Sequence, residues 1–394
     1  MIYLYNSATT YIDSRVLKTM MPYLKEKYGN PSSFHNKGKE ARDAVEMARK
    51  QVAGVLNCAV NEIIFTGGGT EANNLAIQGI IKQVQSSKSK VKSHIITTKI
   101  EHPSVLEVCK YLEKEKLAEI TYLNVDKYGI IDLKELVKSL RSETVLVSII
   151  YANNEIGVIQ DIKKISRVVK KYNNNILLHI DACQASGYLM MDVKKLGVDM
   201  MTINSSKVYG PKGIGALFIK RGVKIKPIMF GGHQEDSLRP GTENVAGIVG
   251  FGSAIELLCE ADYKNEILKV GELRDYFIGE LFKRIPKIRL NGHMVKRLSS
   301  NVNVSILDIE GEALILRLNE KGVYCSTGSA CASGSLEPSY VIMALGVPYE
   351  VAHGSLRFTF GKKTTKKEID YVLKVLPKIV ADLRAISPVK IKKS

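Results

Sequence analysis

Seven short runs of β-branched and aliphatic residues alternate with amphipathic stretches between residues 62 and 219 of the sequence. In chain order the runs are EIIFT, SHIITT, EITYLNV, VLVSIIY, ILLHIDA, VDMMTIN and GIGALFI. Apolar strands separated by helices are typical of a largely parallel sheet with covering helices. We therefore expect an α/β fold. Apolar residues at Ala41, Val45, Ala48 and Val52 recur with helical spacing and predict one covering helix between residues 37 and 57.

The regular alternation of predicted strands and helices ends at about residue 263. A long helical stretch is followed there by the strand NVNVSIL, a helix near GEALILRLNEKG, a loop rich in glycine and serine, the strand SLRFTF and a final helix from Thr365 to about Ile386. A chain of 394 residues also exceeds the size of one compact core. We predict a large domain over residues 14–260 and a smaller α+β domain formed by residues 1–13 and 261–394.

Composition argues against several classes of protein. No stretch has the uninterrupted apolar length of a membrane-spanning helix, so we expect a cytoplasmic protein without a membrane anchor. The six cysteines show no CxxC spacing, which argues against a disulfide framework and a zinc site. The formal charge of +17 comes from scattered lysines, and we interpret it mainly as solvated surface. A transient contact of the basic tail at residues 390–393 with RNA stays open.

Three motifs at predicted strand ends carry residues suited to ligand binding. GGGTEANN, at residues 67–74, joins a strand to a helix, where exposed N–H groups favour a phosphate, although it also suits an ordinary turn. HIDACQ places Asp181 and Gln184 at another strand end, where open α/β sheets bind ligands, although Asp181 also suits a helix cap. NSSKVYGPKGIG fixes Lys207 between a strand end and a glycine cluster.

Together these residue types meet the requirements of a pyridoxal phosphate site. Such a site needs an amine for the Schiff base, which Lys207 provides, and a carboxylate for the pyridinium nitrogen, which Asp181 provides. The GGGTEANN turn offers donors for the phosphate. A partly buried site rich in cations also helps the lysine to lose its proton.

The ordered set of motifs resembles the pyridoxal-phosphate-dependent cysteine desulfurases of the fold-type I superfamily, in their iron–sulfur assembly subgroup. The resemblance extends from about Ile2 to about Leu383 and rests on NSATT, YGNPSS, FTGGGTEANNLAI, EHPSV, ANNEIGVIQDI, HIDACQ, SSKVYGPKGIGAL, RPGTEN, CSTGSACASGSLEPS and SLRFTFG. It implies a mostly parallel seven-stranded sheet in the large domain and a homodimer with shared active sites. It also implies conversion of L-cysteine to L-alanine, with the sulfur passed as a persulfide to an iron–sulfur scaffold protein or a tRNA-thiolation acceptor.

The resemblance further implies roles for individual residues around the cofactor ring. Lys207 corresponds to the lysine that binds the cofactor covalently, and Asp181 to the acid that faces the pyridinium nitrogen. His102 in EHPSV corresponds to the imidazole that stacks on the ring. Gln184 and Asn154 correspond to residues near the phenolic oxygen, and Asn154 also lies near the substrate.

Other positions match residues at the phosphate and the substrate. Gly69, Thr70 and Ser205 stand where the family binds the phosphate. Thr242 in RPGTEN resembles the residue that reaches the phosphate of the partner subunit. Arg357 in SLRFTF corresponds to the arginine that binds the substrate carboxylate, a task that suits a planar two-pronged donor.

Cys331 in STGSACASGS is the expected nucleophile. It lies in a stretch of Gly, Ser and Ala that makes a poor core, and a catalytic thiolate must move between the substrate and an acceptor. We interpret the other cysteines as small buried thiols, the commonest fate of a free cysteine. Cys325 remains a second choice as nucleophile because it is close in sequence.

Two positions depart from the family pattern. Tyr5 stands where an acid is usual, and Ser206 stands where a histidine is usual. A serine hydroxyl can still donate a hydrogen bond, so we expect looser cofactor binding rather than its loss. Three alternatives stay open: a selenocysteine lyase, an aminotransferase of the same superfamily, and a catalytically weakened homologue retained for its partner surface.

Overall fold

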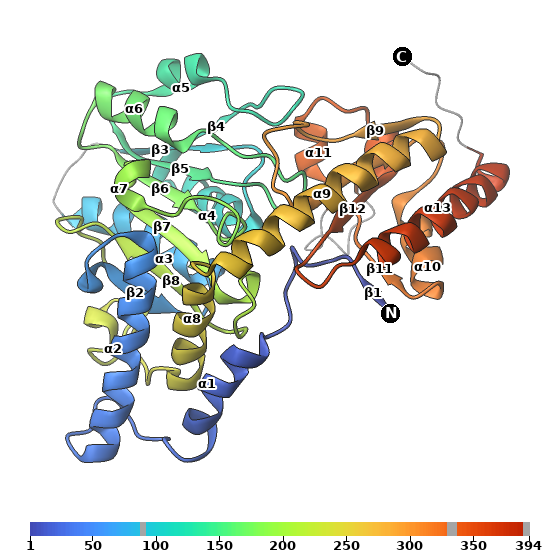
Figure 1. Cartoon of the computed structure of the whole chain (residues 1–394). Coiled ribbons are helices and arrows are strands. Elements are labelled where there is room, and N and C mark those ends of the chain that lie inside the picture. Colours follow the sequence, from blue (N-terminus) through green and yellow to red (C-terminus); the bar gives the residue numbers. More distant parts are fainter. Residues whose placement is uncertain (87–91, 329–336, 389–394) are drawn as a thin grey trace.

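A seven-stranded sheet forms the centre of the larger part of the molecule (Figure 1). The computed structural model describes residues 1–86, 92–328 and 337–388. Its seven strands are β2 (Ile63–Thr66), β3 (Ser93–Thr98), β4 (Ala118–Leu123), β5 (Thr144–Ile150), β6 (Leu177–Asp181), β7 (Met200–Asn204) and β8 (Gly215–Ile219). They lie in the order β2-β8-β7-β6-β5-β3-β4, and β8 runs antiparallel to the other strands of this sheet. Each predicted run forms one strand, and the mostly parallel seven-stranded sheet is confirmed.

Helices cover both faces of this sheet because its strands are apolar on both sides (Figure 1). In β2, for example, Ile63 and Phe65 face one buried cluster while Ile64 faces the other, as the alternation of side chains along a strand requires. One face packs against α1 (Ser14–Lys25), α2 (Asn36–Leu56), α5 (Leu133–Ser139), α6 (Ile162–Tyr172), α7 (Val193–Leu196) and α8 (Val245–Leu257). The other packs against α3 (Gly69–Ser86) and α4 (Pro103–Lys114). Helix α2 confirms the prediction between residues 37 and 57.

The smaller part of the molecule has its own sheet and hydrophobic cluster. Its antiparallel strands are β9 (Ile288–Leu290), β10 (Asn301–Ile306) and β12 (Ser355–Thr359), in the order β12-β10-β9. Around them lie α9 (Ala261–Arg284), α10 (Gly311–Glu320), α11 (Tyr340–Ala344), α12 (Tyr349–His353) and α13 (Lys366–Ile386), with the short parallel pair β1 (Ile2–Tyr3) and β11 (Val323–Tyr324). Leu4 joins the cluster that α9, α10 and α13 form with this sheet. The division into residues 14–260 and residues 1–13 with 261–394 remains a proposal, which this second cluster supports.

The N-terminal segment after β1 connects the two sheets through backbone contacts. Leu4 O accepts a hydrogen bond from Thr359 N at 2.8 Å, and Ser7 N donates to Thr359 Oγ1 at 2.9 Å. A few residues later, Thr10 N donates to Ser206 O at 2.9 Å, just after β7. The segment therefore extends from the end of β12 to the carboxyl end of the large sheet.

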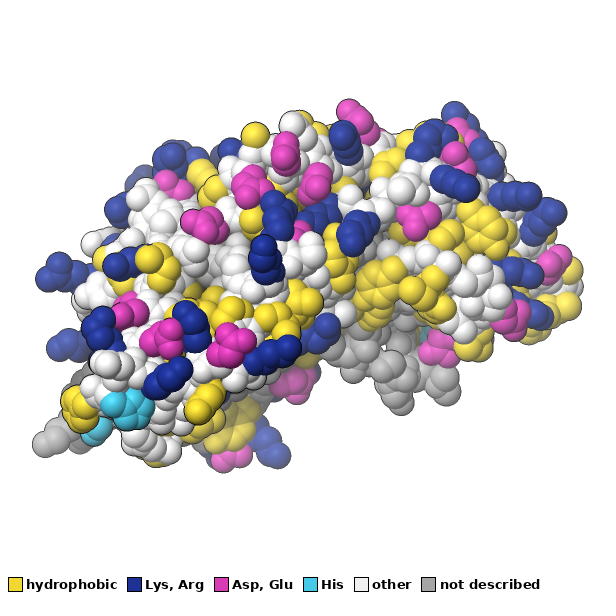
Figure 2. All heavy atoms as spheres, turned by 60° about the horizontal axis from the view of Figure 1, so that its bottom comes forward, with side chains coloured by type: hydrophobic (Ala, Val, Ile, Leu, Met, Phe, Trp, Pro, Cys, Tyr) yellow, Lys and Arg dark blue, Asp and Glu magenta, His cyan; other side chains and the backbone are white. Residues whose placement is uncertain are grey.

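The surface carries charges of both signs. Figure 2 shows Lys and Arg side chains interspersed with Asp and Glu on the face that lies below in Figure 1. This arrangement fits a solvated surface better than a dedicated polyanion site on that face. The basic tail at residues 390–393 lies outside the described residues. Within the part of the chain that the structure describes, no helix combines the length and the apolar character needed to cross a membrane.

Asp13 and Lys362 form a buried ion pair where α1 begins. Their side chains are 8% and 7% exposed. Asp13 Oδ1 also accepts the backbone N–H of Arg15 at 2.9 Å and so caps α1. Although burial alone would raise the pKa of Asp13, hydrogen bonds from Lys362 and Arg15 hold it well below its usual range.

We expect Asp13→Asn to lower the free energy of unfolding by about 3 kcal/mol at pH 7, because it leaves the buried Lys362 ammonium without a counter-charge. Since the folded-state pKa of Asp13 is depressed, its contribution is complete above the unfolded value of about 4 and is lost as the pH falls through the folded value. The free energies of unfolding of the parent and the variant should therefore converge at acidic pH. Urea unfolding at pH 7 and at successively lower pH measures this difference.

The exposed pair of Lys39 and Asp43 provides the control. Its side chains are 65% and 60% exposed, so Asp43→Asn should cost less than about 1 kcal/mol. Equal losses for the two variants at pH 7 would contradict the importance assigned to the buried pair.

Candidate active site

A cavity of about 340 Å³ lies where β5, β6 and β7 end. Ile150 at the end of β5 is in register with Asp181 at the end of β6, and Asn204 ends β7 close by. Carboxyl ends of parallel strands meet at one edge of a sheet, which is where ligands of such folds bind. The cavity is lined by most of the residues that the sequence singled out: Lys207, Asp181, Gln184, Gly69, Thr70, His102, Asn154 and Arg357.

Asp181 is a buried carboxylate with donors on both oxygens. It is 4% exposed. Asn73 Nδ2 donates to its Oδ2 at 2.8 Å, and the Cys183 backbone N–H donates to its Oδ1 at 3.0 Å. Asn73 Nδ2 also donates to Ser104 Oγ at 2.8 Å, which fixes the amide in place. Sequence reasoning missed Asn73 because the neighbouring Asn74 has the same side chain. Only the packing of α3 decides which of the two faces Asp181.

The Lys207 amine lies in the turn Ser205–Lys207 that follows β7 and points toward the N-terminal segment. Its Nζ donates to Ser7 O at 2.8 Å and to Ala8 O. Gln184 Nε2 donates to the same Ser7 carbonyl at 2.8 Å. These carbonyls were not predicted as part of the site, because nothing in the sequence shows that residues 7 and 8 reach β7.

His102 lies at the N-terminus of α4, on the cavity wall. Its Nδ1 accepts the backbone N–H of Ser104 at 3.1 Å and lies 2.8 Å from Ser104 Oγ. Burial lowers the pKa of His102, and the nearby Lys207 and Arg357 charges lower it further against the opposing effect of Asp181. The ring is therefore neutral at neutral pH, and with Nδ1 acting as an acceptor its proton is on Nε2.

Arg357 and Asn154 also line the cavity. Arg357 is 2% exposed, and its Nη1 donates to Asn154 O at 2.9 Å. Within the described part of the chain, Arg357 Nε and Asn154 Oδ1 are buried atoms with no hydrogen-bond partner. Buried polar atoms are almost always paired, so two unpaired ones in residues that line the cavity favour a polar ligand nearby.

The glycine turn at the start of α3 lines the cavity, and its helix N-terminus suits an anion. A Cβ at Gly69 would lie 2.6 Å from Cys183 Sγ, so only glycine lets the helix N-terminus approach β6 this closely. A neighbouring hollow shares Gly69, Thr70 and Asn204 with the cavity and adds Ser206. Ser205, by contrast, is fully buried and has its hydroxyl near Gly210 instead of on the cavity wall. Ser206 therefore faces the glycine turn more directly than Ser205 does.

Glu155 is another residue of the cavity wall that sequence reasoning missed, although it follows Asn154 in the motif ANNEIG. It is 1% exposed, and its carboxyl accepts a hydrogen bond from Ser339 Oγ. A Cβ at Gly328 would lie 3.0 Å from Glu155 Oε2. Gly328 and Ser339 thus bring both flanks of segment 329–336 to this carboxyl. Cys331 itself lies outside the described residues.

Cys325 has the environment of a structural thiol. It is 8% exposed and belongs to the hydrophobic cluster of the smaller part of the molecule. Burial raises its pKa to about 12, despite the opposing charge of Arg357. A thiol of this pKa carries almost no thiolate at neutral pH, which argues against Cys325 as a nucleophile.

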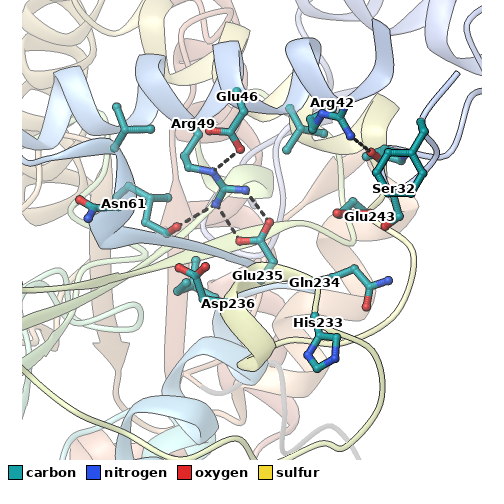
Figure 3. Close-up of a pocket in the computed structure, with 16 residues that line it drawn as sticks. Ser32, Arg42, Glu46, Arg49, Asn61, His233, Gln234, Glu235, Asp236 and Glu243 are labelled. Atoms are coloured by element: carbon teal, nitrogen blue, oxygen red, sulfur yellow. Dashed lines mark hydrogen bonds and ion pairs between the residues drawn. The ribbon is translucent and has the colours of Figure 1, made fainter. Parts of the chain in front are cut away.

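Thr242 is exposed and does not line the cavity. The loop before it borders a hollow of about 960 Å³, which Figure 3 shows between α2 and residues 233–243. There Arg49 donates to Glu235 through Nη2 at 2.6 Å and Nη1 at 2.7 Å, and Phe65 N donates to Glu235 Oε2 at 2.7 Å (Figure 3 shows the two side chains). These bonds anchor the loop that precedes Thr242 to the edge of the large sheet.

The fold agrees with what comparison with known proteins finds. The sequence model of the family described as Aminotransferase class-V matches residues 2–372, and the chain belongs to this family. A protein named cysteine desulfurase IscS from Dictyoglomus turgidum is 51% identical over 390 residues, which are 99% of this chain and 97% of that one. A cysteine desulfurase IscS from Methanosarcina thermophila is 50% identical over 388 residues, 98% of this chain and 94% of that one.

A solved structure carries the same likeness. A structure titled NifS-like protein superimposes with a TM-score of 0.89 at 38% identity and covers 97% of this chain and 100% of that one. The resemblance to the cysteine desulfurases that the sequence motifs indicated is therefore confirmed.

The bond between Asn73 and Asp181 yields a stability prediction. We expect Asn73→Ala to lower the free energy of unfolding by about 2 kcal/mol, because the buried Asp181 carboxylate loses a charge-assisted hydrogen bond. Asn74→Ala, one residue along the same helix, should change it by less than about 0.5 kcal/mol, because Asn74 bonds only within α3. Urea unfolding of both variants in the same cofactor state measures the difference, and equal stability of the two would contradict the proposed importance of the bond.

Proposed function

We propose that this protein is a cysteine desulfurase that uses pyridoxal 5'-phosphate to convert L-cysteine to L-alanine and retains the sulfur as a persulfide on Cys331. The observation that carries the proposal is that one cavity contains the amine of Lys207, the carboxylate of Asp181 and the guanidinium of Arg357. These groups lie in a chain that is 51% and 50% identical to two proteins named cysteine desulfurase IscS.

The residues present fit the cofactor. Asp181 offers a buried carboxylate for a protonated ring nitrogen, and the N-terminus of the 18-residue helix α3 offers donors for a phosphate. The unpaired Asn154 Oδ1 lies on the same wall and can accept from a bound group. When bound, pyridoxal phosphate acts as an electron sink that weakens the bonds at the α-carbon of an amino acid.

Arg357 is suited to bind the α-carboxylate of the substrate. Its guanidinium is buried, and the unpaired Nε provides a donor that a carboxylate oxygen can occupy. Planar pairing of guanidinium with carboxylate fixes orientation as well as position. In this orientation, we expect the substrate amine to face Lys207. We expect the substrate side chain to face Glu155, which Gly328 also approaches.

Lys207 and His102 are the groups placed to move protons. With the cofactor bound, Lys207 Nζ would be the group that takes the proton from the substrate α-carbon and returns a proton to the product. The Ser7 and Ala8 carbonyls, which accept from Nζ, restrict where this amine can point. His102 is neutral and carries its proton on Nε2, so it can act as a donor near the substrate.

The sulfur step requires a thiolate from the chain, and we assign it to Cys331. Its Sγ attacks the substrate sulfur, an S–S bond forms as the substrate C–S bond breaks, and the released electron pair is taken up by the carbon that becomes the alanine methyl group after protonation. The resulting persulfide passes to an acceptor thiol of an iron–sulfur scaffold protein or of a tRNA-thiolation system.

A homodimer with shared active sites completes the proposal. Thr242 is exposed and outside the cavity of its own chain, as a residue that serves a second copy would be. The buried bonds between Arg49 and Glu235 support the loop that precedes it.

Comparison of Cys331→Ser with Cys325→Ser tests the nucleophile. With L-cysteine and excess thiol reductant, we expect the parent and Cys325→Ser to release alanine at similar rates, and we expect Cys331→Ser to lose at least about a hundredfold. Quantification of alanine and sulfide measures both products. Equal release by the parent and Cys331→Ser would contradict the assignment, and preference for L-selenocysteine without need of Cys331 would favour a lyase.

Lys207→Ala tests the cofactor site without turnover. After borohydride reduction, the parent should retain the cofactor as a covalent adduct detectable by mass spectrometry, and Lys207→Ala should carry none. Lys212→Ala, an exposed lysine of the same glycine-rich segment, is the matched control and should retain the adduct. An adduct that persists in Lys207→Ala would overturn the assignment.

A further inference from the structure

Tyr5 lies with its aromatic ring over the guanidinium of Arg357. The Arg357 Cζ atom is 5.3 Å from the centre of the Tyr5 ring, within the range of cation–π attraction. Arg357 lies in the middle of β12, opposite Asn303 of β10, and is 2% exposed. Desolvation of the cation strengthens its attraction to the ring face. Among the residues that the structure describes, no carboxylate forms an ion pair with Arg357.

This contact holds the cation without using its hydrogen-bond donors. A carboxylate beside the guanidinium would occupy N–H groups along its edge. An aromatic ring instead attracts the charge through its π-electron face, which leaves the edge free. In agreement with this difference, Arg357 Nη1 donates to Asn154 O, while Nε is buried and has no partner in the described part of the chain.

Tyr5 is itself held by the backbone of β12. It forms a parallel bridge with Thr359, whose N–H donates to Leu4 O at 2.8 Å. The Tyr5 carbonyl accepts the N–H of Ala8 at 3.1 Å, in a tight turn. The Ala8 carbonyl in turn accepts from Lys207 Nζ. One short segment therefore contacts both Arg357 and Lys207, two residues that line the cavity.

We propose that Tyr5 is a positioning residue for Arg357: its ring orients the guanidinium so that Nε remains available to the carboxylate of the substrate. The inference rests on the proposed function only in taking that substrate to be an α-amino acid. Binding to the oriented guanidinium requires nothing more than a carboxylate. The tyrosine in place of the usual acid thus becomes part of substrate binding.

Binding of 3-mercaptopropionate to the holoenzyme tests the inference. This probe has the carboxylate and thiol of cysteine but no amine, so it does not displace Lys207. By calorimetry, we expect Tyr5→Leu to raise its Kd about tenfold, because the guanidinium loses the ring that orients it. Tyr5→Phe keeps the ring and should remain within about twofold of the parent.

Two further variants calibrate the measurement. Tyr3→Leu removes a neighbouring ring, whose centre is 6.5 Å from that of Tyr5, and should leave the Kd within about twofold of the parent. Arg357→Ala should abolish binding and so defines the maximal loss. If Tyr5→Leu does not fold, Tyr5→Met removes the ring while keeping a side chain of similar length.

Steady-state kinetics separate positioning from a general structural defect. For L-cysteine we expect Tyr5→Leu to raise KM about tenfold and to change kcat less than about threefold, because the ring acts on carboxylate binding and not on bond breaking. Unchanged probe binding in Tyr5→Leu would overturn the inference, and so would an equal loss in Tyr5→Phe. If no variant or parent releases alanine while probe binding follows the expected order, the desulfurase proposal fails and this inference stands.

Discussion

The attachment of the N-terminal segment to the end of β12 is the constraint on which the active site depends. Thr359 exchanges backbone hydrogen bonds with Leu4 and Asn6. The carbonyls of residues 7 and 8 then accept hydrogen bonds from Lys207, which follows β7. The segment belongs to the hydrophobic cluster of the smaller part of the molecule through Leu4, yet it forms a wall of a cavity at the edge of the large sheet. The segment therefore connects the strand that carries Arg357 with the turn that carries Lys207.

The ionisable side chains of the cavity are stabilised in different ways. Asp181 is buried, and its carboxylate accepts hydrogen bonds from the Asn73 amide and the Cys183 N–H. Burial and two nearby cations keep His102 neutral. Arg357 is stabilised by the Tyr5 ring face, and burial raises the pKa of Glu155 against the opposing effects of Arg357 and Ser339. The result is a cavity whose wall contains both donors for an anion and the amine of Lys207.

The main features of the fold and most of the cavity wall were predictable from the sequence. The strand runs are apolar on both faces, which only a covered parallel sheet accommodates. Lys207, Asp181 and Arg357 stand in motifs whose order carries the family resemblance. Asn73 was not predictable because its neighbour Asn74 has the same side chain, and only the packing of α3 decides which of them faces Asp181. The placement of Ser205 and Ser206 was not predictable either, because the turn between β7 and Lys207 decides which hydroxyl faces the glycine turn.

By itself, the sequence determined the elements and the chemistry available to them, because hydrophobic period and local motifs depend on neighbours along the chain. Only the tertiary structure decided how distant groups combine. Tyr5 and Arg357 are separated by most of the chain, and their contact arises because the N-terminal segment pairs with β12. Glu155 likewise meets Gly328 and Ser339 only through the packing of the two sheets. Such contacts follow from burial and register between remote segments, and no local pattern in the sequence encodes them.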